Sequence, residues 1–112
     1  MRNPLFPALC SLLLSCSDAT IPIEIDATII TIVDNGFISN HVQVFPDQQV
    51  VWNWTGANSH SVTFDTPGIE PSPTMNVGQI SRRFETFTSG DVITYYCSVH
   101  GREVMSGIIA IR

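Results

Sequence analysis

The chain has 112 residues, which is enough for one domain with a two-layer core and too few for two domains. It contains no Lys, five Arg and ten acidic residues, so its formal net charge is −5 at pH 7. A surface of this sign does not attract nucleic acid or anionic lipid headgroups. The composition therefore argues against a nucleic-acid-binding protein and against one that binds membranes through basic patches.

The first fifteen residues have the pattern of a secretory signal. One Arg precedes an apolar run over residues 5–14, which is too short to span a bilayer as a stable helix. Leu13-Leu14-Ser15-Cys16 resembles a bacterial lipobox, in which the signal is cut before a cysteine that receives lipid. We predict a lipoprotein-type signal over residues 1–15 with lipidation of Cys16; an ordinary signal cut near Ala19 is the alternative. Either form predicts an exported protein, in the periplasm or outer cell envelope.

Residues 16–26 are polar and interrupted by proline, and we predict that they form a tether. With Cys10 removed and Cys16 lipidated, Cys97 is the one remaining cysteine, so no intramolecular disulfide can form. A lone cysteine in an oxidising compartment is a hazard unless something occupies it, and a metal would do so. Removal of Arg2 with the signal would leave a net charge of about −6.

From residue 27 onward, short apolar or alternating runs recur with turn residues between them, which is typical of an all-β sandwich. Asp34-Asn35-Gly36 is a turn signal, and the prolines of segment 66–74 favour a loop without a long helix. The sequence therefore predicts one all-β domain over residues 27–112. The expected strands are 27–33, 41–44, 49–54, 60–65, 79–87, 92–97 and 107–112.

Alternation of apolar residues assigns side chains to the two faces of each strand. Three sets are expected to share a face: Val50, Trp52 and Trp54; His60, Val62 and Phe64; Ile93, Tyr95 and Cys97. The thiol of Cys97 should therefore point where core residues point, and the neighbouring Tyr96 should face solvent.

The segment that follows strand 92–97 carries three metal-binding groups on one short loop. Two residues separate Cys97 from His100, and four separate His100 from Met105. His60, after the strand ending at Trp54, supplies a second imidazole. Thiolate and thioether beside imidazole select copper over harder metals, and two His with one Cys and a weak axial Met form the blue-copper set. We predict one copper ion held by these four residues.

Each ligand alone has a simpler explanation, since a buried Cys or Met usually serves packing. The ordered combination of four ligand types within an all-β pattern favours the metal site. His41 lies outside the motif and is expected to be exposed. Met75 has no partner at ligand spacing, so we expect it to fill a gap or to be exposed.

From Ile29 to the C-terminus the chain resembles the cupredoxin family, in particular the plastocyanin-like and halocyanin-like small type 1 (blue) copper proteins. In that family a strand ending in Trp and Asn leads to the first His ligand, as Trp52-Asn53-Trp54 leads to His60. A final hairpin holds Cys-x2-His-x4-Met, and the last strand follows the Met through a small residue and Gly, as in Met105 to Ile111. The resemblance implies a cupredoxin-like Greek-key β-sandwich that binds copper.

The resemblance also indicates which residues surround the ligands. Relatives often carry Asn after the first His, where it joins the two ligand loops; here Ser61 stands there and Ser98 follows Cys97, so a hydroxyl pair is expected to replace it. Trp54 stands where relatives tend to carry Asn. Its side chain either packs against the site or fills the core, and the sequence favours neither role.

In plastocyanin-like proteins an apolar patch around the second His is the docking face and the short electron path. The resemblance places His100 and Val99 in that patch, with Arg102 adding a charge that would affect partner choice. Tyr96 matches a family tyrosine that offers a longer electron path. The sequence equally allows Tyr96 to be an exposed aromatic residue of the strand without a function.

The resemblance implies a monomeric one-electron carrier with transient redox partners, such as a cytochrome or an oxidoreductase of the cell envelope. A copper-binding and delivery protein is the alternative, although a complete four-ligand site in a stiff sandwich favours retention of the metal. We do not expect the protein to be an enzyme. Multicopper oxidases carry His on both sides of the loop Cys, where this chain has Tyr96 and Ser98, and a binuclear copper centre would need two loop cysteines.

Overall fold

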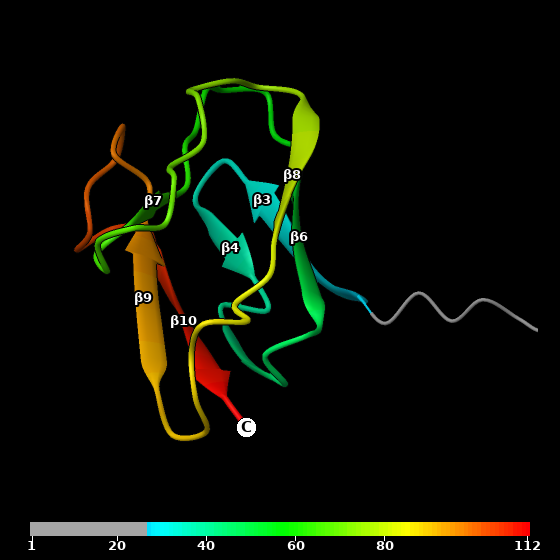
Figure 1. Ribbon diagram of the computed structural model, residues 1–112. Coiled ribbons are helices and arrows are strands. Elements are labelled where there is room, and N and C mark those ends of the chain that lie inside the picture. Colours follow the sequence, from blue (N-terminus) through cyan, green and yellow to red (C-terminus); the bar gives the residue numbers. More distant parts are fainter. Residues whose placement is uncertain (1–26) are drawn as a thin grey trace, which may run out of the picture.

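Two mixed four-stranded sheets pack face to face in the computed structural model, which describes residues 27–112 (Figure 1). The predicted signal over residues 1–15, the lipidated Cys16 and the tether over 16–26 lie outside the described residues. One sheet has the spatial order β4 (Gly36–Ile38), β3 (Ala27–Val33), β6 (Gln49–Trp54), β8 (Gly78–Arg82). The other has the order β5 (His41–Val44), β10 (Ser106–Ile111), β9 (Val92–Tyr96), β7 (Thr63–Phe64).

Each sheet contains one parallel pair and two antiparallel pairs. β3 runs parallel to β6, and β10 runs parallel to β5. The remaining neighbours in each sheet are antiparallel. The predicted all-β sandwich is confirmed, and the predicted bounds of β3, β5 and β6 match those of the structure.

The core lies between the sheets and follows the predicted alternation. The side chains expected to face inward on β6, and those expected on β9 with Cys97, are all buried. Tyr95 packs edge to face on Trp52, with ring centroids 5.4 Å apart, and on Phe37, at 4.9 Å. Such aromatic pairs contribute about 0.5–1.5 kcal/mol each beyond their buried area. Gly107, opposite Tyr95 in the sheet, leaves room for the phenol, because a Cβ there would lie 2.2 Å from Tyr95 Oη.

The predicted strand over residues 60–65 was wrong in its length. Only Thr63–Phe64 forms a strand, because the preceding segment leaves β9 and pairs elsewhere. His60 forms an isolated antiparallel bridge with Met75, with backbone N···O distances of 2.9 and 3.1 Å. Met75, expected as a gap-filling or exposed residue, is partly buried against the core and also fixes the backbone of His60.

Two further expectations are corrected by the structure. The predicted strand 79–87 begins at Gly78 and ends at Arg82, because the next segment turns inward to bury Phe84. The amide of Phe84 bonds Pro46 O at 3.2 Å instead of continuing the ladder with β6. Strand β4 was not predicted; it follows the turn after β3 and buries Phe37.

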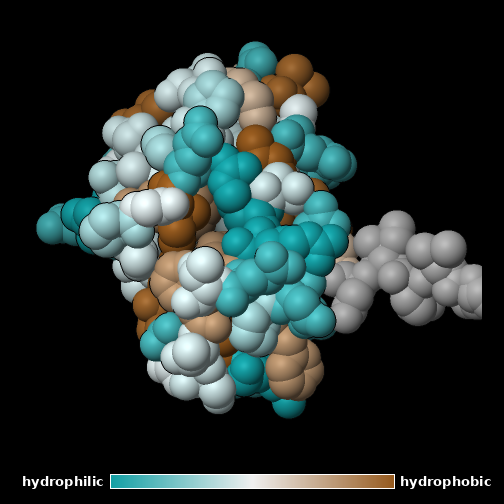
Figure 2. Space-filling model, viewed as in Figure 1, coloured by the Kyte–Doolittle hydropathy of each residue, from teal (hydrophilic) through white to brown (hydrophobic). Residues whose placement is uncertain are grey.

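The loop over residues 97–105 lies at one end of the sandwich, and the C-terminus lies at the opposite end (Figure 1). The segment that joins β8 to β9 turns at the same end as the C-terminus, where Gly90 N bonds Ile111 O at 2.9 Å. On the face seen in Figure 2, hydrophobic residues form separate small patches among hydrophilic ones. Within residues 27–112 no helix has the length and apolar character to cross a membrane.

Candidate metal centre

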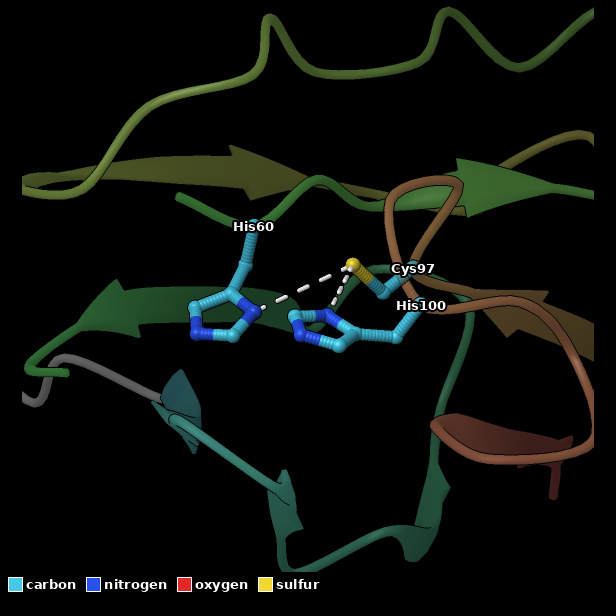
Figure 3. Close-up of side chains that lie close together, drawn as sticks. All are labelled: His60, Cys97 and His100. Atoms are coloured by element: carbon cyan, nitrogen blue, oxygen red, sulfur yellow. Dashed lines mark hydrogen bonds between the residues drawn. The ribbon is translucent and has the colours of Figure 1, made fainter. Parts of the chain in front are cut away.

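Three of the four predicted ligands meet in space at the end of the sandwich where β9 finishes. The ligand atoms of His60, Cys97 and His100 all lie within 4.8 Å of one another. The Nδ1 atoms of His60 and His100 lie 3.9 and 3.5 Å from Cys97 Sγ, as the dashed lines in Figure 3 show. The two imidazole rings stack with centroids 4.9 Å apart and an interplanar angle of 29°. Both rings therefore present the same nitrogen to one sulfur.

His60 is fully buried and is held by contacts from three other parts of the chain. Its backbone pairs with Met75, and its carbonyl also accepts a hydrogen bond from Trp54 Nε1 at 3.0 Å. Its ring Nε2 lies 3.1 Å from Asp34 Oδ1. Of the two roles left open for Trp54, the structure therefore shows both: the side chain is buried, and it contacts the segment that carries the first histidine.

Cys97, His100 and Met105 are held by a loop whose hydrogen bonds are mostly internal. Gly101 N bonds Cys97 O at 2.8 Å, Met105 N bonds Gly101 O at 3.0 Å, and Cys97 N bonds Met105 O at 3.0 Å. Gly101 adopts φ of 92°, a left-handed conformation that glycine accepts without strain. Met105 is buried beside Cys97 in this loop, and the ligand role of its sulfur stays a prediction.

The environment of the Cys97 sulfur favours its thiolate form. Burial raises the pKa of this thiol, but hydrogen bonds from the His100 ring and from the backbone of Ser61, His100 and Val99 outweigh burial, so the pKa is lowered overall. The Ser61 amide lies 3.5 Å from Sγ. A thiolate is the form that binds metal.

The predicted hydroxyl pair is present between the two ligand segments. Ser61 Oγ lies 2.7 Å from Ser98 Oγ and accepts a hydrogen bond from Ser98 N at 2.9 Å. Ser61 is buried, so this link between the His60 segment and the Cys97 loop is shielded from water on one side. The pair joins the two ligand segments, which is the role that the family resemblance gives to Asn in relatives.

Arg102 does not extend freely into the surface around His100. Its guanidinium pairs with the Asp65 carboxylate and lies 4.2 Å from the centroid of the Tyr96 ring. Tyr96 consequently faces away from the core but is half-buried instead of open to solvent. Val99 and Val104 are exposed at 52% and 65% on the loop that carries His100, which is itself not buried.

Asp34 also contacts the site and was not predicted from the sequence. Its Oδ1 accepts a hydrogen bond from Asn58 N at 2.9 Å as well as contacting His60. The Asn58 amide, then the His60 ring and the Ala57 amide, lower the pKa of Asp34. In the sequence, Asp34 was recognised only as part of a turn signal, and no local pattern links it to His60. His41, as expected, is exposed and takes no part in the site.

The donor set fits a copper ion better than a hard cation. Two imidazoles and a thiolate are soft or intermediate ligands, and no carboxylate joins the cluster within the described residues. Hard cations such as Mg²⁺ and Ca²⁺ prefer several oxygen ligands.

No protein-family model matches the chain, and no curated protein sequence matches it. Solved structures do match. Oxidised plastocyanin from Dryopteris crassirhizoma superposes with a TM-score of 0.63 at 16% identity, covering 76% of this chain and 100% of that one. A Cu(I) amicyanin variant gives 0.64 at 22%, covering 78% and 83%. A purple cupredoxin from Nitrosopumilus maritimus gives 0.63 at 18%, covering 76% and 99%. These similarities show that the chain has the cupredoxin fold.

Proposed function

We propose that this protein is a type 1 copper protein that carries single electrons between redox partners. The observation that carries the proposal is the assembly of His60, Cys97 and His100, with both imidazole Nδ1 atoms directed at one buried sulfur. The cupredoxin fold and the Cu(I) amicyanin among its structural neighbours support it. His60, Cys97 and His100 would hold the ion, with Met105 as a weak axial ligand.

Copper supplies one-electron chemistry when bound, because it is stable as Cu(I) and as Cu(II). The residues of the chain serve this chemistry by holding the ligand side chains in fixed positions. Cys97 is buried in a strand-to-loop junction, and His60 is fixed by backbone, indole and carboxylate contacts. A fixed ligand frame lowers the structural change that accompanies each electron transfer.

The surface around His100 is the proposed contact for partners. Val99 and Val104 are exposed on the loop that carries this histidine, while Arg102 is folded back onto Asp65 and Tyr96. A small apolar surface favours brief contacts with fast release. We propose a transient protein partner, such as a cytochrome or an oxidoreductase, and a monomeric carrier.

The experiment that tests this function compares two rates in one sample. The protein loaded with one equivalent of Cu(I) is mixed either with an oxidised cytochrome or with a copper-free acceptor protein. A carrier should reduce the cytochrome much faster than it loses its copper. Faster loss of copper to the acceptor, with slow cytochrome reduction, would favour copper delivery instead.

The ligand role of Met105 has its own test. Replacing Met105 by Leu removes a weak axial donor, and this favours Cu(I) over Cu(II). We expect a higher reduction potential with the blue colour retained, measured by spectroelectrochemistry. An unchanged or lower potential would exclude Met105 as the axial ligand.

We also propose that the protein is exported and attached to an envelope membrane through lipid on Cys16. The lipobox-like Leu13-Leu14-Ser15-Cys16 supports this. A tether would raise the effective concentration of membrane-bound partners, so tight docking would be unnecessary. The test is cell fractionation of the full-length precursor and its Cys16→Ser variant. Membrane association of the wild type alone is expected, and a wholly soluble wild type starting beyond Cys16 would contradict the anchor.

A further inference from the structure

The Asp34 carboxylate meets the buried ring of the first histidine on the side away from the sulfur. Asp34 Oδ1 lies 3.1 Å from His60 Nε2, while His60 Nδ1 faces Cys97 Sγ at 3.9 Å. The His60 side chain is 0% exposed and that of Asp34 is 42% exposed, so the carboxylate reaches inward from the surface. The carboxylate and the sulfur thus lie on opposite nitrogens of one imidazole.

The parallel pairing of β3 with β6 brings this carboxylate to the histidine. The register aligns Ile32 with Trp54, so the residues that follow both strands leave the sheet at the same end. Thr55 N and Thr55 Oγ1 bond Ile32 O at 3.0 and 2.9 Å and extend the contact beyond the strands. The Asn58 amide then holds Asp34 Oδ1 at 2.9 Å.

Gly56 leaves the space that the carboxylate occupies. A Cβ at this position would lie 2.2 Å from Asp34 Oδ1 and 3.1 Å from the Asp34 amide nitrogen. Any larger residue would therefore push the Asp34 side chain away from its place. The turn after β3 and the segment after β6 thus meet at this carboxylate.

A neutral imidazole carries one proton, and an ionised carboxylate can only accept a hydrogen bond. Contact with Asp34 therefore places the proton of His60 on Nε2 and leaves the Nδ1 lone pair directed toward Cys97. His100 differs, because no hydrogen bond reaches its Nε2 from any residue between 27 and 112. Of the two histidines, only His60 has a hydrogen-bond partner at Nε2 within residues 27–112.

We propose that Asp34 is a positioning residue for the metal centre: its carboxylate fixes the Nε2–H form of His60 and so prepares Nδ1 as a copper ligand. This role rests on the proposed copper function. Partners of metal-binding histidines of this kind commonly change metal affinity by about 10–100-fold. An anionic partner also makes the imidazole a stronger donor, which favours Cu(II) more than Cu(I).

The first measurement needs no metal. In the ¹⁵N-labelled, metal-free protein at a pH where the ring is neutral, long-range ¹H–¹⁵N spectra report which nitrogen of His60 carries the proton. The wild type should show Nε2–H alone. Asp34→Ala, which removes the acceptor, and Gly56→Ala, which displaces the carboxylate but keeps its charge, should both show a mixture with Nδ1–H. Glu85→Gln is the matched control, because it removes an exposed carboxylate from the segment between β8 and β9.

The second measurement uses the copper-loaded protein. Asp34→Ala should lower Cu(II) affinity by about 10–100-fold, and Cu(I) affinity by less. If the two losses differ tenfold, the reduction potential rises by about 59 mV. Asp34→Asn keeps an oxygen acceptor and loses the charge, so it should retain Nε2–H while still raising the potential. Glu85→Gln should change neither value.

A His60 ring that stays wholly Nε2–H in both Asp34→Ala and Gly56→Ala would overturn the proposal. The proposal would also be overturned if Asp34→Ala had the same Cu(II) affinity and the same reduction potential as the wild type. A failure of the copper function is seen separately, as a wild type that forms no blue complex. The proton position in the metal-free protein is measured in either case.

Discussion

The two sides of the metal centre are built in different ways. His60 depends mainly on residues distant in the sequence: Asp34 contacts its ring and Met75 pairs with its backbone, while Trp54, which lies closer in the sequence, donates a hydrogen bond to its carbonyl. The loop that carries Cys97, His100 and Met105 is closed by hydrogen bonds among its own residues. His60 is fully buried, whereas His100 on the local side reaches the surface. The fold thus fixes one ligand firmly in the core and presents another where a partner can approach.

The local side can be broken with the largest effect by removing its sulfur. Cys97→Ser replaces a soft thiolate by a hard, poorly acidic hydroxyl, so the thiolate-to-copper band should vanish. Cu(I) affinity should fall by more than the ~100-fold typical of a lost outer partner. Titration with a Cu(I) chelator and visible spectroscopy measure both. A variant that stays blue would exclude Cys97 as the ligand, and circular dichroism should show the fold retained.

The support of His60 can be weakened through Trp54. Trp54→Phe removes the hydrogen bond to His60 O, which costs about 1 kcal/mol, and leaves a cavity that adds to this. We expect a lower free energy of unfolding together with a changed reduction potential, because His60 loses one of its supports. Trp52→Phe is the matched control on the same strand, since the buried Trp52 indole, unlike that of Trp54, donates no hydrogen bond to the His60 carbonyl.

Trp52→Phe should lower the free energy of unfolding without changing the potential. Equal shifts of the reduction potential in both variants would show that general loosening of the core changes the potential, and not the loss of a support of His60.

The hydroxyl pair between the two sides offers a finer test. Ser61→Ala leaves Ser98 N without its acceptor and should cost about 1 kcal/mol. Ser98→Ala should cost less than half of that, because Ser61 Oγ keeps the Ser98 amide and Thr63 Oγ1 as partners. Denaturant unfolding of the metal-free proteins compares the two. A larger loss for Ser98→Ala would contradict the account of this link.

The smallest effect is expected at Arg102, which joins the local loop to Asp65 and Tyr96. Exposed ion pairs and cation–π contacts are weak in water, so Arg102→Gln should lower the free energy of unfolding at pH 7 by no more than Ser98→Ala does. Glu103→Gln, on the same loop, is the control. A loss larger than that of Ser61→Ala would show that Arg102 holds the loop in place.

The pH dependence of this loss has a defined sign. Hydrogen bonds from Arg102 and then Thr94 lower the pKa of Asp65. A carboxylate with a lowered pKa stabilises the fold above its unfolded value of about 3.9, and this stabilisation is lost as the pH falls through the folded value. The difference between wild type and Arg102→Gln should therefore shrink in acid. A difference that grows in acid would contradict the ion pair.

The same contrast explains what could be predicted from the sequence. Alternation along β6 and β9 predicts which residues face the core, and the spacing of Cys97, His100 and Met105 predicts a ligand loop, because both patterns are local. The contact between Asp34 and His60 depends on the parallel register of β3 with β6, which alternation does not determine. The pairing of His60 with Met75 likewise joins two loops whose sequences carry no mutual signal.

The central claim is that the fold brings two imidazoles and one thiolate together as a type 1 copper site. Addition of one equivalent of Cu(II) to the metal-free protein, followed by visible and electron paramagnetic resonance spectra, tests this most directly. The account predicts an intense thiolate-to-copper band and a narrow copper hyperfine splitting. A colourless, tetragonal Cu(II) complex at that stoichiometry would contradict it.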